Sequence, residues 1–259
     1  MERSLLNRRN LLNAAVSLSA LGLLPRSISA QTAPGEFTKS TEPFATVKIH
    51  QGSLRGGHSR GAIAFKGIPY AGAPTGKHRF MEAPSAPHWS GVRDALTLGP
   101  PTLQTPGGSF GENEPAGSED CLVLNVWTPA VNDGKKRPVM FYIHGGGYHS
   151  GSAGAPSQDG SHLASTYDVV VVACNHRLGL LGYMYLGDLG GTKYATSGNQ
   201  SMLDLVAALR WVRDNITVFG GDPGNVMIFG ESGGGFKTGT LLAMPAAHGL
   251  FHKASVESG

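Results

Sequence analysis

Short apolar runs separated by polar and Gly-rich segments are the main pattern along this chain. Such runs, bounded by Gly, Asn or Pro, are too short for helices and predict buried strands. We expect strands over residues 122–127, 139–143, 169–173 and 226–229, a last strand near 254–257, and an early strand pair over 46–54 and 62–65.

Helical spacing appears twice between these runs. Met202, Leu205, Val206 and Leu209 recur on one face of a predicted helix over Gln200–Asn215 and are expected to be core. Residues 233–243 predict a second helix. Strands that alternate with helices favour an α/β fold with a twisted, mostly parallel sheet flanked by helices.

Ser232 lies at the junction between the strand over 226–229 and the helix over 233–243, in a G-x-S-x-G frame. A serine presented on so sharp a turn needs neighbours without bulk, which Gly230 and Gly234 provide. The N–H of Gly233 opens the helix, where unpaired donors favour a developing oxyanion. The frame alone is weak, because a chain with 38 glycines can form such a pentapeptide as a simple turn.

A second Gly-rich block follows the predicted strand over 139–143. His144 precedes three glycines, Gly145, Gly146 and Gly147. Glycine allows a backbone to approach a substrate closely and to turn its N–H groups inward. The block is similar to the oxyanion loops of lipases and esterases.

Longer stretches of sequence carry a family resemblance. Residues 219–234 resemble in full the serine signature of the type B carboxylesterases, relatives of the cholinesterases, and residues 119–129 resemble the family's second signature. Val123 departs from that second signature, where Tyr or Thr is more usual. The resemblance runs from about residue 47 to residue 259, and it corresponds to the N-terminal half of such an enzyme.

The resemblance implies an α/β-hydrolase fold and hydrolysis of a small-molecule carboxylic ester by acyl transfer through a serine, with no cofactor and no metal. Ser232 would be the nucleophile, and the N–H groups of Gly146, Gly147 and Gly233 would form the oxyanion hole. His144 would shape the loop and would not act as the base. Arg177 and Asp204 occupy the positions of a structural ion pair in the family.

Composition and charge narrow the function further. The 259 residues with 40% hydrophobic content can bury one sizeable core, so one domain is the default. No apolar stretch reaches the roughly 20 residues of a membrane span. The net charge of +3 resides in residues 1–30, which hold four Arg and one Glu, while the remainder is balanced. Nucleic-acid binding therefore has no electrostatic support.

Residues 1–30 resemble an export signal. Arg8 and Arg9 begin a twin-arginine-like motif, an apolar stretch follows over residues 11–24, and residues 27–30 offer small side chains for cleavage. An ordinary Sec signal with a basic end is the alternative. Either route predicts a periplasmic or secreted protein whose residues 31–259 form the N-terminal part of a carboxylesterase domain.

The chain has two cysteines, Cys121 and Cys174. In relatives, the cysteine at the position of Cys121 closes a disulfide with a partner about twenty residues upstream, where this chain has Pro101, Thr102 and Leu103. That disulfide is therefore not expected. Cys174 follows an apolar strand, and we expect it to be a buried thiol.

The residues after Ser232 do not supply the rest of a catalytic triad. The order in this fold is Ser, then an acid, then His, but only Glu257, His248 and His252 follow Ser232. We expect both histidines at the surface, because the intervening helix would carry the chain roughly 16 Å from the serine. The fold is thus expected to be C-terminally incomplete, with an uncovered sheet edge and apolar face, and activity would need a complementing C-terminal polypeptide.

Three other interpretations are open to the sequence. The chain could be a non-catalytic binding module, as in the cholinesterase-like adhesion proteins, although those typically lose the serine. Residues 230–238 nearly form a phosphate-binding loop, but Phe236 stands where that loop requires glycine before Lys237. The spacing of His248 and His252 suits a metal pair, but no third ligand is indicated.

Overall fold

The computed structural model describes residues 43–105 and 115–259. The chain divides into two units, Met1–Lys39 and Ser40–Gly259, and every described residue belongs to the second unit. The expected export signal, residues 1–30, lies outside the described residues. Across the described ranges, no helix is both long and apolar enough to cross a bilayer.

The described part of the chain contains nine strands and five α-helices, together with short 3-10 helices. The strands are β1 (Phe44–Ile49), β2 (Gly52–Ser59), β3 (Ala62–Pro69), β4 (Val92–Asp94), β5 (Val123–Thr128), β6 (Arg137–Tyr142), β7 (Val170–Cys174), β8 (Gly221–Glu231) and β9 (Lys253–Glu257). The helices are α2 (Ser161–Tyr167), α3 (Gly179–Tyr183), α4 (Gly187–Gly190), α5 (Gln200–Asn215) and α6 (Gly233–Ala243).

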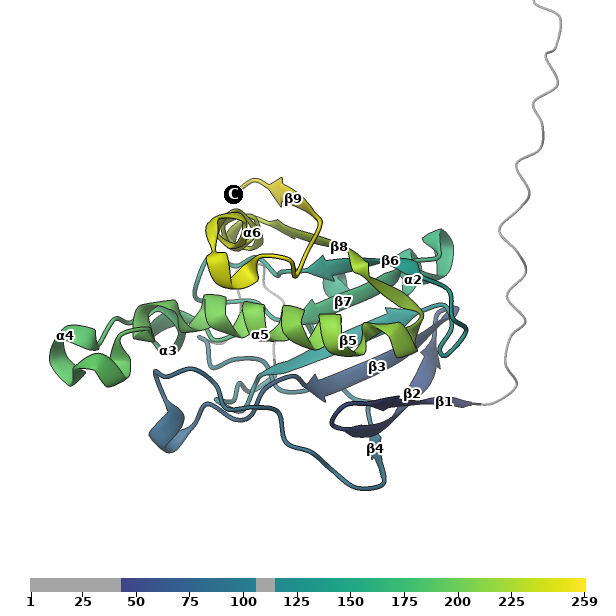
Figure 1. Cartoon of the computed structure of the whole chain (residues 1–259), viewed down its shortest axis with the longest axis horizontal. Helices are drawn as coiled ribbons and strands as arrows, with labels where there is room; N and C mark the ends of the chain where they lie inside the picture. Colours follow the sequence, from purple (N-terminus) through teal and green to yellow (C-terminus); the bar gives the residue numbers. More distant parts are fainter. Residues whose placement is uncertain (1–42, 106–114) are drawn as a thin grey trace, which may run out of the picture. The chain divides into compact units, whose positions relative to one another are not determined.

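All nine strands join one twisted sheet in the order β1-β2-β3-β5-β7-β6-β8-β9, with β4 paired to β2 (Figure 1). Neighbours from β1 to β7 along this order are antiparallel, whereas β7, β6, β8 and β9 are parallel. The sheet is therefore mixed, and the expected parallel arrangement applies to the half that carries Ser232. This places the carboxyl ends of β6 and β8, and the loops that follow them, at the same edge of the sheet.

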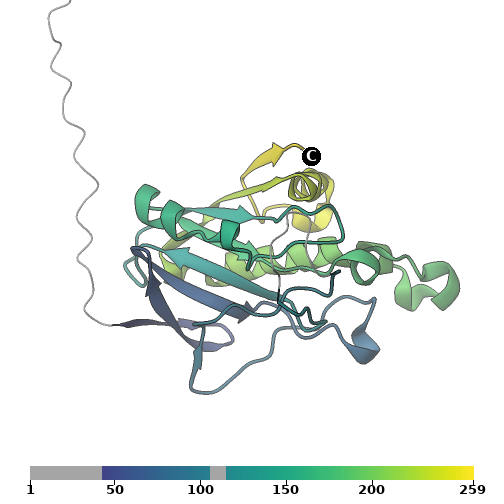
Figure 2. The same cartoon turned by 180° about the vertical axis from the view of Figure 1, so that it is seen from behind.

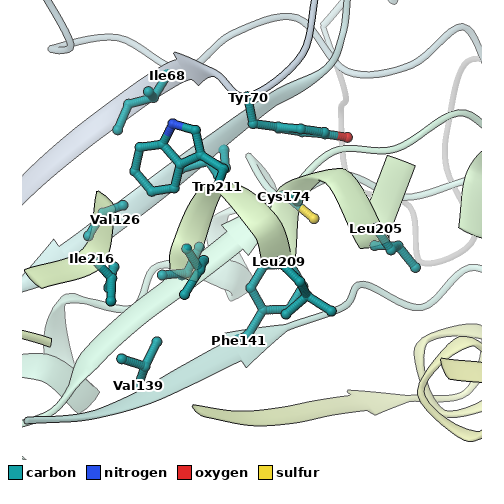
Figure 3. Close-up of a cluster of buried hydrophobic side chains, with 14 of the residues drawn as sticks. Ile68, Tyr70, Val126, Val139, Phe141, Cys174, Leu205, Leu209, Trp211 and Ile216 are labelled. Atoms are coloured by element: carbon teal, nitrogen blue, oxygen red, sulfur yellow. The ribbon is translucent and has the colours of Figure 1, made fainter. Parts of the chain in front are cut away.

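Helices cover the sheet on both faces. Figure 1 shows α5 in front of the sheet, and Figure 2, drawn from behind, shows α2 on the opposite face. Alternate residues of β7 divide between these layers: Val172 belongs to the larger core with α5, and Val171 belongs to the smaller core with α2. In the larger core, Leu209 of α5 lies over Phe141 of β6, and Leu205 lies further along the helix (Figure 3).

A buried ion pair ties the end of β7 to α5. Arg177 donates from Nη2 to Oδ1 of Asp204 at 2.7 Å and from Nε to Oδ2 at 2.9 Å, and its backbone N–H reaches Oδ2 at 3.0 Å. Both side chains are at most 2% exposed. The predicted structural ion pair is confirmed, and it fixes α5 against the strand beside the candidate site.

The predicted helices agree with α5 and α6 at both ends, but the expected strand over residues 46–54 is wrong. That segment spans two strands, because the chain reverses at His50 and Gln51 and pairs Val47 of β1 with Leu54 of β2. The turn lies in a polar run, His50 and Gln51 followed by Gly52, and the prediction continued a single strand through this break. The short elements β4, α2, α3 and α4 were not predicted.

The last strand, β9, forms an edge of the sheet within the described residues, and most of its side chains are exposed. On the face away from α5, Met140 of β6 and Met227 and Phe229 of β8 are only half-buried. The edge strand agrees with the prediction, whereas these half-buried side chains show that the apolar face is partly covered.

Candidate active site

Ser232 is the single residue between β8 and α6, and its backbone has a positive φ of 53° with ψ of −123°. A non-glycine residue in this region is strained by about 1 to 3 kcal/mol, and such strain is typical of nucleophiles on a strand-to-helix turn. The turn is held on both sides: the N–H of Ser232 donates to the carbonyl of Glu257 in β9 at 2.9 Å, and its carbonyl accepts from Phe236 at 3.0 Å.

The glycines around Ser232 are required by space. A Cβ on Gly230 would lie 2.6 Å from the carbonyl oxygen of Ile143 and 2.6 Å from the carbonyl carbon of Gly234. A Cβ on Gly234 would overlap the same Ile143 oxygen. These contacts press the turn against the residue that follows β6, so only the G-x-S-x-G frame allows the two segments to meet.

The loop His144–Gly147 directly follows Ile143, the residue that contacts the serine turn. Gly146 and Gly147 have φ of 87° and 62°, which places both in the region that favours glycine. A Cβ on Gly233 would overlap the backbone of Gly147, so the loop and the first residue of α6 are in direct contact. The structure therefore brings together the four residues that the sequence proposed as nucleophile and oxyanion donors.

The proposed donors are free to bind a ligand. Within the described residues, the N–H groups of Gly146, Gly147 and Gly233 donate no hydrogen bond. Strained, well-anchored backbone with unused donors is what an oxyanion hole requires, because its N–H groups must be fixed before negative charge develops. The loop itself is closed by Ser150, whose N–H donates to the carbonyl of Gly146 at 3.1 Å.

The described residues do not bring a base to Ser232. His248 is exposed, as expected. His252 is also exposed and accepts from the N–H of Val226 at 3.2 Å. Val226 lies six residues before Ser232 along the strand, and thus roughly 20 Å from it. The carboxylate of Glu257 accepts from Ser255 at 3.0 Å. Ser232 makes no side-chain hydrogen bond in this part of the chain.

His144 is a structural residue. It is 3% exposed, and its Nδ1 lies 2.9 Å from the carbonyl oxygen of Gly145, which makes Nδ1 the donor. Its ring stacks on that of His176, with centroids 4.4 Å apart and planes at 3°. Burial, with the nearby Lys237 charge, lowers the pKa of His144 to about 3. The imidazole stays neutral and supports the loop, in agreement with the predicted role.

Lys237 is a buried polar residue that sequence analysis assigned to no site. It lies one turn into α6, its side chain is 0% exposed, and its Nζ donates to the carbonyl oxygen of His144 at 3.3 Å. Burial lowers the pKa of Lys237 to about 7. The lysine points toward the loop His144–Gly147 and is not available to a phosphate at the helix start. The spacing of four to buried Leu241 is the signal that could have revealed it.

Both cysteines are free and buried, which confirms the predicted burial of Cys174. Thr102 occupies the region of the relatives' disulfide partner. Its Oγ1 donates to the carbonyl oxygen of His176 at 2.6 Å and lies 3.2 Å from Sγ of Cys121. Burial raises the pKa of Cys121 to about 12 and raises that of Cys174 further. Neither thiol is reactive in the fold.

An apolar cavity of about 320 Å³ lies close to the loop. Tyr148, which follows Gly147 directly, lines it together with Tyr183 from α3, Met202 from α5 and Thr240 from α6. The rings of Tyr148 and Tyr183 meet edge to face with centroids 5.0 Å apart. The cavity thus begins one residue beyond the proposed oxyanion donors.

Comparison with known proteins decides the family. The sequence profile described as "Carboxylesterase family" matches residues 43–259. The chain belongs to the carboxylesterase family. Among its relatives, the para-nitrobenzyl esterase of Bacillus subtilis is 46% identical over 217 residues, which are 82% of this chain and 43% of the relative. Human carboxylesterase 3 is 47% identical over 88% of this chain and 41% of the relative.

Solved structures confirm the α/β-hydrolase fold. The Geobacillus stearothermophilus carboxylesterase, at 49% identity, superposes with a TM-score of 0.76 over 81% of this chain and 42% of its own length. A para-nitrobenzyl esterase structure gives 0.75 at 44% identity. The chain thus spans less than half the length of the relatives that it matches, so the activity of a whole carboxylesterase enters only as a proposal below.

Proposed function

We propose that this chain carries the nucleophile and the oxyanion hole of a carboxylic ester hydrolase. The observation that supports this best is the strained Ser232 beside three unused backbone donors, Gly146, Gly147 and Gly233. Membership of the carboxylesterase family supports the same chemistry. The relatives' names, carboxylesterase and para-nitrobenzyl esterase, agree with an ester substrate.

The proposed reaction is acyl transfer. Oγ of Ser232 attacks the ester carbonyl carbon, and the carbonyl oxygen gains negative charge that the three N–H groups stabilise. The alcohol leaves when the tetrahedral intermediate collapses to an acyl-serine, and water then releases the acid. We propose that the cavity beside Tyr148 receives an apolar part of the ester.

Proton transfer needs a base that the described residues do not bring to Ser232. We propose that a further polypeptide segment, corresponding to the part of the relatives beyond this chain, supplies the acid and the histidine. Without it, turnover should fall by about four to six orders of magnitude, leaving about 10³ to 10⁴ over water from binding and the oxyanion hole.

Ester turnover tests this proposal. The full chain is assayed with p-nitrophenyl acetate, alone and mixed with the C-terminal part of the Bacillus subtilis relative, and Ser232→Ala is the matched control. We expect low turnover from the chain alone, an increase on mixing, and loss of that increase in Ser232→Ala. An increase on mixing that is unchanged in Ser232→Ala would contradict the proposal.

We further propose that residues 1–30 direct export, which would make the protein periplasmic or secreted. The paired Arg8 and Arg9, with the apolar stretch after them, support this. Expression in a bacterial host, followed by fractionation, tests it. Substituting both arginines by lysine should retain the protein in the cytoplasm if the route is twin-arginine, whereas continued export after the substitution would favour the Sec alternative.

A further inference from the structure

Lys237 is a fully buried cation without a counter-ion among the described residues. Lysine is almost never fully buried unless it is paired, yet no ion pair of the described chain includes Lys237. It is also only one turn from the amino end of α6, where the helix dipole disfavours a positive charge. The energetic cost of burying this unpaired charge requires an explanation other than packing.

Two neighbouring segments surround the ammonium group. From the loop after β6, the carbonyl of His144 accepts its hydrogen bond, and the ring of Tyr148 lies 5.8 Å away, within range of a cation–π contact. From the end of β7, Cys174 and His176 face it electrostatically. Burial raises the pKa of Cys174, so its thiol stays neutral and provides no counter-charge.

The two histidines provide no negative charge to balance the ammonium group of Lys237. Burial and the Lys237 charge lower the pKa of both His144 and His176, so both rings stay neutral. Each ring also has a buried Nε2 with no hydrogen-bond partner in the described chain. The hydrogen bond to the His144 carbonyl is therefore the specific polar contact that Lys237 makes.

The carbonyl of His144 belongs to the peptide plane that enters Gly145–Gly147. Two contacts already join α6 to this segment, from Gly234 to Ile143 and from Gly233 to Gly147. The Lys237 hydrogen bond adds a third, at the peptide between them. Because glycines impose little restriction on their own dihedral angles, external contacts must fix the loop.

We propose that Lys237 is a positioning residue for the oxyanion loop: its ammonium group, through the hydrogen bond to the His144 carbonyl, fixes the peptide from which the loop starts. This rests on the proposed function of Ser232 only where it concerns reactivity; the effect on loop order does not depend on it. Since the pKa of Lys237 is about 7, the loop is held most firmly below that pH and less firmly when the amine is neutral.

Hydrogen exchange of the full chain tests the effect on the loop. In Lys237→Met, which removes the donor and keeps an unbranched side chain, exchange of residues 143–150 should rise about tenfold at pH near 6, the order expected for one lost hydrogen bond. The matched control is Lys253→Met, an exposed lysine that donates to Asn225. It should leave the loop unchanged. Equal loop exchange in Lys237→Met and the unmodified chain would overturn the proposal.

A second measurement covers the case in which Lys237→Met fails to fold. Loop exchange of the unmodified chain, corrected for the intrinsic pH dependence of exchange, should show protection that decreases between about pH 6 and pH 9. Constant protection would overturn the proposal. With the C-terminal part of the Bacillus subtilis relative supplied, labelling of Ser232 by a fluorophosphonate should slow in parallel. If Ser232 is never labelled in this mixture, the proposed function fails while the exchange result still decides the role of Lys237.

Discussion

Burial of Lys237 predicts that the stability of the protein depends on pH in an unusual direction. Its pKa is about 7 in the fold and about 10.4 in an unfolded chain, so the unfolded state binds more protons between these values. The free energy of unfolding should therefore rise with pH across this window, and the full penalty of the buried charge is present below about pH 7. Replacement of Lys237 by Met removes this contribution.

The magnitude follows from the two pKa values. At about 1.4 kcal/mol per pKa unit, the difference corresponds to about 5 kcal/mol at pH 6 and to about 2 kcal/mol at pH 9. Loss of the hydrogen bond leaves the His144 carbonyl unpaired, which opposes the gain by about 1 to 3 kcal/mol at either pH. Lys237→Met should thus be more stable than the unmodified chain by about 2 to 4 kcal/mol at pH 6, an advantage that shrinks by about 3 kcal/mol at pH 9.

Urea unfolding at several pH values, followed by tryptophan fluorescence, measures this difference. Titrating groups that do not interact with Lys237 contribute equally to both proteins, so their contributions cancel in the comparison. A stability difference that stays constant between about pH 6 and pH 9 would refute the reasoning, because Lys237 would then have an ordinary pKa in the fold. The same result would show that the ammonium finds solvent or a counter-ion.

Substitutions at Gly234 and Asp204 and labelling of the two cysteines test the packing around the site and in the core. Gly234→Ala should destabilise the fold by about 1 to 3 kcal/mol or more, because its Cβ would overlap backbone, whereas Gly239→Ala, in open space on the same helix, should stabilise it by about 0.5 to 1 kcal/mol in thermal unfolding. Asp204→Ala should cost about 3 to 5 kcal/mol in urea unfolding, since it leaves a buried guanidinium unpaired. Cys121 and Cys174 should react with a thiol reagent only after denaturant is added, and rapid reaction of either in native protein would contradict their burial.

The elements that the sequence predicted correctly are those whose evidence lies within one continuous segment. Helix α5 follows from the spacing of its buried residues, and α6 follows from the G-x-S-x-G frame, in which the serine turn leads into a helix. The strand over 46–54 failed because the polar run from His50 to Gly52, which marks a tight turn, was included within a single strand. The expected mostly parallel sheet is mixed because the early strands add as antiparallel neighbours, which a count of alternating elements does not reveal.

The parts of the candidate site that could be predicted are those formed by continuous sequence motifs. Ser232 and its flanking glycines form one continuous motif, and the loop at Gly146 and Gly147 forms another. Their contact through Ile143 depends on β6 and β8 being neighbours, which is a property of the topology. Lys237 was overlooked because its significance lies in its burial under the loop, and a lysine in a sequence is read as exposed by default.

Covalent labelling of Ser232 tests the central claim most directly. The full chain, with the C-terminal part of the Bacillus subtilis relative supplied, is treated with a fluorophosphonate, whose phosphoryl oxygen imitates the oxyanion, and the adduct is located by mass spectrometry of peptides. The account predicts a single adduct on Ser232 that is absent in Ser232→Ala. An adduct on another residue, or no adduct in this mixture, would contradict the assignment of Ser232 as the nucleophile.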